Sequence, residues 1–295
     1  MHRRADSSTM IGMQRRDFLP ALPAGLGWLS SARSAAAANT RVKIGVTDWN
    51  LRLSSQLEAV AMAADLGFAG VEVSLGRTPV DGKLPLADKA VQDHYLEAAA
   101  SRKIALAGTC LDILHVNYLK FDKLGQKWVA DGIPITKRLG ARVMLLPFFG
   151  KGAIQTPAEM DYVGDVLREI APEAERASVI LGLENTINAA DNIRIADRTR
   201  SSAVQIYYDC GNLLRAGFEP LPELKRMGRD RICQVHLKDN PHYLGDGTID
   251  FRRLLALLDE MKWTGFANLE TDSPSKDIAA DMRRNLTYIR QLMAA

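Results

Sequence analysis

The sequence has little of several features that mark specialised proteins. Its 295 residues include three cysteines, an odd number, and no Cys-x-x-Cys pair, which argues against a closed disulfide framework or a zinc ribbon. With 47% hydrophobic, 25% charged and only 6% aromatic residues, it does not have the composition of collagen-like, disordered or coiled-coil proteins. No apolar run reaches the ~20 residues of a membrane span. One large α/β domain or two small ones remain.

The first 38 residues have the pattern of an export signal. Arg15 and Arg16 directly precede an apolar stretch from Phe18 to about Leu29, and the alanine-rich segment 34–38 follows. A basic region, a short apolar region and a small-residue cleavage site are the parts of a secretory signal. The arginine pair resembles a twin-arginine signal, which directs folded proteins to export. We therefore expect a precursor recognised by the twin-arginine export machinery and a mature protein in the periplasm.

This segment also accounts for the basic charge of the chain. The formal net charge is +3, and residues 1–38 contain five arginines and two aspartates, which leaves 33 basic and 33 acidic residues in the rest. A neutral mature part gives no electrostatic reason to expect a nucleic-acid partner. Because such signals begin shortly before the arginine pair, Met13 is an alternative start to Met1, and the cleavage position stays open.

From Arg41 onward, short apolar strands alternate with amphipathic helices. This alternation predicts right-handed crossovers and a parallel sheet. Eight units in about 250 residues predict a single-domain (β/α)₈ TIM barrel over residues 39–295. A doubly wound open sheet is less favoured, because no Gly-rich phosphate loop follows the first strand. The expected strands are Val42–Thr47, Gly70–Ser74, Ile104–Cys110, Val143–Pro147, Val179–Glu184, Val204–Asp209, Cys233–Leu237 and Phe266–Glu270. The expected helices are Ser54–Leu66, Asp88–Arg102, Lys123–Leu139, Pro157–Ala177, Ala190–Thr199, Leu221–Met227, Phe251–Met261 and Ser275–Leu292.

Four consecutive predicted strands end in a side chain that can bind a metal ion. These side chains are Glu184, Asp209, His236 and Glu270. In a barrel of this kind they meet at the carboxyl end of the strands, where like charges repel unless a cation lies between them. Three carboxylates and one imidazole favour a hard or borderline divalent ion, namely Mn²⁺, Mg²⁺, Co²⁺ or Zn²⁺.

The order Glu, Asp, His, Glu on these strands resembles the xylose isomerase-like TIM barrels, the sugar (phosphate) isomerase/epimerase family. Three strings are similar to family motifs: 66–73 to L-G-[FY]-x-G-V-E, 236–239 to H-x-K-D, and 245–251 to G-x-G-x-[IV]-D-[FW]. The resemblance covers the whole mature chain. It implies that the four residues bind one divalent ion, that Glu184 and Glu270 act as acid and base, and that the partner is a small carbohydrate. It also implies a homodimer.

The chemistry expected at such a site follows from general principles. A divalent ion bound by a carbonyl and its neighbouring hydroxyl acidifies the C–H bond between them. One carboxylate then removes the proton, and the other returns it to the same carbon, giving an epimer, or to the adjacent carbon, giving an isomer. Loss of a β-hydroxyl from a keto sugar or cyclitol at the same site would give a lyase or dehydratase. Export favours a free or keto sugar over a sugar phosphate. A non-catalytic, metal-containing carbohydrate-binding protein is the alternative of another class.

Two positions depart from the pattern of the ketose 3-epimerases in this family. Asn212 stands where those enzymes carry a histidine, and His242 stands where they carry a substrate-binding arginine. A simple free-ketose 3-epimerase is therefore less favoured, and five histidines are too few for a three-metal nuclease. Substrate contacts are expected from six residues, each with an ordinary structural role as its alternative: Trp49, Glu72, His115, Asn212, Lys238 and His242.

Overall fold

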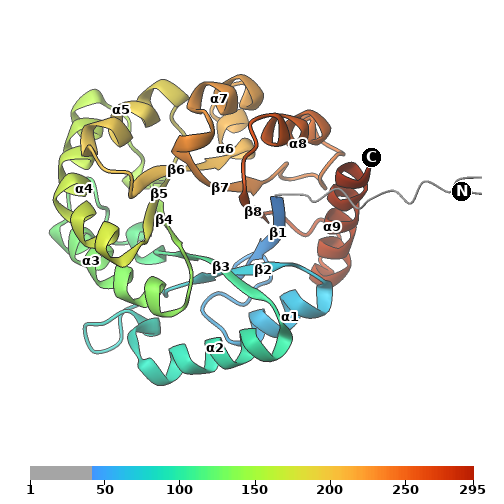
Figure 1. Ribbon diagram of the computed structural model, residues 1–295, viewed down its shortest axis with the longest axis horizontal. Coiled ribbons are helices and arrows are strands. Elements are labelled where there is room, and N and C mark those ends of the chain that lie inside the picture. The colour runs from blue at the N-terminus through green and yellow to red at the C-terminus, as the bar shows by residue number, and fades with distance from the viewer. Residues whose placement is uncertain (1–41) are drawn as a thin grey trace, which may run out of the picture. The chain divides into compact units, whose positions relative to one another are not determined.

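Residues 42–295, which the computed structural model describes, form a closed barrel of eight parallel strands (Figure 1). The strands follow one another around the barrel in sequence order, and β8 pairs with β1 to close it. The predicted (β/α)₈ fold is thus confirmed, whereas the expected leader, residues 1–38, lies outside the described residues. The strands are β1 Val42–Thr47, β2 Gly70–Ser74, β3 Ala105–Cys110, β4 Val143–Pro147, β5 Ile180–Glu184, β6 Val204–Asp209, β7 Ile232–Leu237 and β8 Gly265–Leu269.

Helices surround the barrel and cover the outer face of the strands (Figure 1). Their ends follow ordinary capping rules. Gly67 at φ 91° ends the first helix in the left-handed conformation that glycine adopts without strain. Thr156 and Glu159 form a reciprocal capping box at the start of the fourth. The helices are α1 Glu58–Leu66, α2 Lys89–Arg102, α3 Lys123–Arg138, α4 Pro157–Ala177, α5 Ala189–Thr199, α6 Cys210–Arg215, α7 Pro220–Met227, α8 Phe251–Glu260 and α9 Ile278–Ala294.

All eight strands agree with their predicted ranges to within one residue at each end. Three differences concern helices. The α9 helix begins at Ile278 rather than Ser275 and ends at Ala294 rather than Leu292. The α1 helix begins at Glu58 rather than Ser54, since turns occupy residues 54–57. The short α6 helix was not predicted, and it starts directly after β6. There the Asp209 carboxylate accepts a 2.7 Å hydrogen bond from the backbone N–H of Asn212. Asp209 therefore caps a helix as well as ending a strand.

Apolar side chains pack mainly between the strands and the surrounding helices. A smaller buried cluster within the described residues contains Cys110, Val143, Leu145, Tyr207 and Cys233. The three cysteines are buried free thiols, as the sequence predicts. Among the described helices, none combines the length and the apolar character needed to cross a bilayer.

Candidate active site

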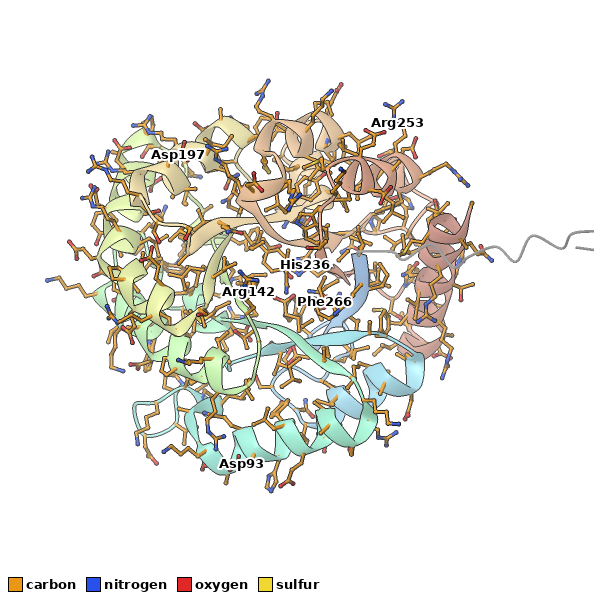
Figure 2. All side chains as sticks on the ribbon, in the orientation of Figure 1. Asp93, Arg142, Asp197, His236, Arg253 and Phe266 are labelled. Carbon is orange, nitrogen blue, oxygen red and sulfur yellow. The ribbon has the colours of Figure 1, made fainter. Side chains whose placement is uncertain are left out.

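The four predicted ligands lie together at the carboxyl end of the barrel. One ligand atom from each of Glu184, Asp209, His236 and Glu270 lies within 4.8 Å of the others. Strand register explains the grouping, because Asp209 pairs directly with His236 across β6 and β7, and Glu270 follows β8 immediately. In Figure 2, His236 lies near the middle of the barrel, whereas Asp93, Asp197 and Arg253 lie on the outer helices. Three carboxylates and an imidazole at this spacing fit a divalent ion.

Glu184 and Glu270 have different surroundings. The Glu184 carboxylate accepts a hydrogen bond from the Asn212 side-chain amide at 3.0 Å and lies 3.1 Å from Nδ1 of His236. Burial raises the pKa of Glu184 to about 7, and the negative charges of Glu270 and Asp209 add to the shift, although His236 opposes it. The carboxyl can therefore exchange a proton near neutral pH.

Burial by itself would raise the pKa of Glu270, but the Lys238 ammonium and the His236 imidazole hold it well below its usual range. Its Oε1 also accepts a 3.0 Å hydrogen bond from the indole of Trp49. The two glutamates thus differ in protonation, and such a separation of pKa values is typical of acid–base pairs in enzymes.

Lys238 lies among the ligand candidates. Its ammonium lies 3.2 Å from Asp209 Oδ2 and 3.3 Å from Asn212 Oδ1, and it also donates to Glu270. These carboxylates outweigh the effect of burial and raise the pKa of Lys238, so the ammonium stays charged. Lys238 therefore places a positive charge beside the carboxylates of Asp209 and Glu270.

A cavity of about 850 Å³ opens above the ligands. Four of the six residues predicted to contact substrate line it: Trp49, His115, Asn212 and Lys238. His115 stacks on Phe149, with ring centroids 6.1 Å apart, so this side of the cavity offers an apolar and aromatic surface. Such surfaces favour the flat faces of sugar rings.

The other two predicted contacts lie elsewhere. Glu72 is fully buried and is absent from the cavity lining. It bonds His236 of β7 instead, across the barrel rather than on a neighbouring strand. His242 is exposed and also lies outside the lining. Its loop is tied to α9, because Tyr243 donates to Asp281 and the Leu244 amide donates to Asn285.

Sequence reasoning missed several residues of the site. Four residues line the cavity from loops and short helices, where no local pattern marks them: Arg77, Asp112, Thr186 and Arg215. Burial raises the pKa of the Asp112 carboxyl, and interactions with Cys110, Ser74, His115 and Arg77 oppose this shift.

The sequence spacing could have identified three further buried polar residues: Tyr207, Gln234 and Asn268. Each precedes a ligand candidate by two residues, and such residues share one face of a strand.

Comparison with known proteins gives a consistent picture. The family model described as "Xylose isomerase-like TIM barrel" matches residues 60–292. A 2-epi-5-epi-valiolone 7-phosphate 2-epimerase from Actinoplanes sp. is 27% identical over 229 residues, which cover 73% of this chain and 82% of that protein. An inosose dehydratase from Geobacillus kaustophilus is 31% identical over 110 residues, which cover 29% of this chain and 35% of the dehydratase.

Two solved structures share the fold. The 3-keto-D-glucoside 4-epimerase of E. coli has a TM-score of 0.70 at 22% identity, over 85% of this chain and 99% of that chain. An L-ribulose 3-epimerase has a TM-score of 0.68 at 19% identity, over 85% of this chain and 94% of that chain.

Proposed function

Since the chain belongs to the xylose isomerase-like TIM barrel family, we propose that it is a divalent-metal-dependent sugar epimerase or isomerase that removes a proton next to a carbonyl. The substrate is a free or keto sugar, and the catalytic pair is Glu184 and Glu270. The arrangement of the two glutamates carries the proposal. Both line the cavity, and their ligand atoms lie within 4.8 Å of those of Asp209 and His236. Their pKa values shift in opposite directions.

Glu184, Asp209, His236 and Glu270 would hold the ion. When bound, a divalent ion would polarise the substrate carbonyl and so acidify the adjacent C–H bond. One of the two glutamates accepts that proton, and the other donates a proton to the opposite face or to the neighbouring carbon. Lys238 holds Glu270 ionised, and Asn212 orients Glu184 through its side-chain amide. Trp49 and the Phe149–His115 pair keep the sugar against the ligands.

A dehydratase is the second candidate. It is favoured by the local match to an inosose dehydratase and uses the same proton removal, followed by loss of a β-hydroxyl as water. The epimerase remains preferred, because the longer match, over 229 residues, is to an epimerase.

The test is proton-exchange NMR in D₂O with the metal-loaded full chain. The panel contains free ketoses, 3-keto glucosides and cyclitol ketones, each offered with and without a phosphate group. Deuterium at a carbon next to a carbonyl, with an epimer or isomer as product, supports the proposal, and an unsaturated product supports the dehydratase. Ligand binding without exchange or product across the whole panel would favour a carbohydrate-binding protein. A strict need for the phosphate would contradict the preference for a free or keto sugar.

Export and self-association remain parts of the same proposal. The twin-arginine segment lies outside the described residues, so cell fractionation of a chain with Arg15→Lys and Arg16→Lys tests the periplasmic location. Retention of this variant in the cytoplasm is expected, whereas unchanged export would contradict it. Light scattering of the purified mature chain tests the homodimer, which a monomeric mass would overturn.

A further inference from the structure

A second layer of polar side chains lies inside the barrel, directly below the candidate metal ligands. Tyr207, Gln234 and Asn268 each precede a ligand by two residues on β6, β7 and β8, and Glu72 joins them from β2. We call these four residues the floor network. All four are at least 97% buried, and none lines the cavity. A buried polar layer is costly unless its groups are paired, so its arrangement calls for an explanation.

The centre of the floor network is one oxygen of Glu72. Its Oε2 accepts hydrogen bonds from the Tyr207 hydroxyl at 2.7 Å and the Asn268 side-chain amide at 3.0 Å, and it lies 3.0 Å from His236 Nε2. Tyr207 and Asn268 come from β6 and β8, on either side of β7, which carries His236. Glu72 reaches them from β2, on the far side of the barrel. The carboxylate is therefore held from three directions against one nitrogen of the imidazole.

The other nitrogen of His236 faces the metal ligands. Nδ1 lies 3.1 Å from Glu184 Oε1, 3.4 Å from Glu270 Oε2 and 3.6 Å from Asp209 Oδ2. A neutral imidazole carries one proton, and the nitrogen that binds a metal must be the one without it. A carboxylate at Nε2 keeps the proton there and leaves the Nδ1 lone pair for the ion.

We propose that Glu72 is a positioning residue for metal binding: it fixes both the tautomer and the ring orientation of His236, and the rest of the floor network fixes Glu72. This inference rests on the metal site proposed above. The alternative is that Glu72 only fills the barrel interior. Under the proposal, Glu72 affects metal binding through its contact with His236. Under the alternative, it affects only the stability of the barrel.

Local backbone features support a specific placement of the network. The register of β2 against β3 shifts immediately before Glu72, and that of β6 against β7 shifts immediately before Tyr207. Such irregularities redirect side chains. On β1, a Cβ atom at Gly45 would lie 2.1 Å from Asn268 Oδ1. Only glycine at this position leaves the Asn268 amide free to reach Glu72.

The test measures Mn²⁺ affinity of the full chain by electron paramagnetic resonance titration. Glu72→Leu removes the acceptor for Nε2–H and is expected to weaken binding by about 10–100-fold. Glu72→Gln keeps a neutral acceptor in the same place, so it should recover most of the affinity. Gly45→Ala leaves Glu72 itself unchanged but places a Cβ atom where the Asn268 side chain lies, so it should give an intermediate loss of Mn²⁺ affinity. Val71→Ala, in the same strand and also fully buried, is the matched control: it lowers the melting temperature without altering Mn²⁺ affinity.

A second readout observes the imidazole directly. In ¹⁵N-histidine NMR of the Zn²⁺-loaded chain, His236 should carry its proton on Nε2 in the wild type and in Glu72→Gln. In Glu72→Leu that signal should broaden or exchange rapidly with water. Wild-type affinity in Glu72→Leu, or an equal loss in Val71→Ala, would overturn the positioning role while leaving the metal site intact. Failure of the wild type to bind any divalent ion would overturn the metal site itself, and this inference with it.

Discussion

The two halves of the barrel mouth differ in what their strands present. Strands β5 to β8 end in three carboxylates and an imidazole, and within residues 42–295 these four side chains form the only group spaced to hold a metal ion. Strands β1 to β4 and the loops that follow them contribute most of the cavity wall, including Trp49, His115 and Phe149. One half therefore holds the candidate ligands, and the other forms most of the cavity wall. The halves should respond differently to substitution: changes in the first should affect turnover, and changes in the second should affect substrate binding.

The largest effect is expected from the two glutamates. Glu184→Gln and Glu270→Gln keep the side-chain volume but remove the proton acceptor, so turnover should fall by about 10²–10⁴-fold. Steady-state kinetics with the substrate identified by NMR provides the measurement. Asp112→Asn is the matched control, since it makes the same change in the same cavity from the opposite half and should keep kcat close to the wild type. Full turnover in either glutamine variant would contradict the proposed mechanism.

The next effect concerns pH. In the metal-free chain Glu184 has a pKa of about 7, and the negative charges of Glu270 and Glu184 raise the pKa of His236 well above its usual range despite its burial. Below these pKa values both groups hold protons that an incoming ion must displace. Metal affinity should therefore rise with pH through neutrality and fall in acid.

Isothermal titration in buffers of different ionisation enthalpy measures the protons released. At least one proton per ion is expected near pH 7, and Glu184→Gln should release fewer. An affinity that is independent of pH between about pH 5.5 and pH 8 would contradict this linkage.

A smaller effect should come from Trp49, a cavity-wall residue of the β1–β4 half that hydrogen-bonds to the ligand candidate Glu270. Trp49→Phe keeps an aromatic ring but removes the 3.0 Å hydrogen bond to Glu270. A hydrogen bond to a charged group contributes roughly 1.5–3 kcal/mol, so kcat should fall by about 10–100-fold. Steady-state kinetics of this variant show whether a residue of the β1–β4 half affects kcat. A change in KM with no change in kcat would show that Trp49 contributes to substrate binding alone.

The smallest effect is expected at His115. It stacks on Phe149 and has no hydrogen bond to the four ligand candidates. His115→Ala removes an aromatic surface, so it should raise KM by a few-fold, the equivalent of about 1 kcal/mol, and leave kcat unchanged. A large loss of kcat would show that the wall half takes part in proton transfer.

The strands could be predicted closely because their apolar runs are short and repeated eight times, and several of them follow a helix that ends at a glycine. The four ligand candidates could be grouped because parallel strands place all their carboxyl ends at one mouth. Glu72 illustrates the limit of this reasoning. It lies within a strand that leads to the mouth, yet the cavity does not reach it, because depth along a strand depends on register and bulges. The periodicity of a sequence does not show how far from the mouth of the barrel a strand residue lies.

The cavity wall could be predicted only in part. Arg77, Asp112 and Arg215 come from loops and short helices, whose course depends on tertiary packing rather than on a local pattern. Asn212 shows the intermediate case. Its position three residues after Asp209 marked it as a candidate, but its side-chain contacts to Glu184 and to Lys238 depend on the unpredicted α6 helix. Residues on strands were thus easier to place than residues on connections.

Lys238 has a consequence for how the protein matures. Its ammonium contacts Asp209 and Glu270, so the metal-free centre already contains an internal counter-ion. A centre made of carboxylates alone would strain the folded chain until an ion arrived. With this counter-ion in place, folding does not require a metal ion to balance Asp209 and Glu270. At the proposed metal site, folding would come first and metal loading second, as two separate events.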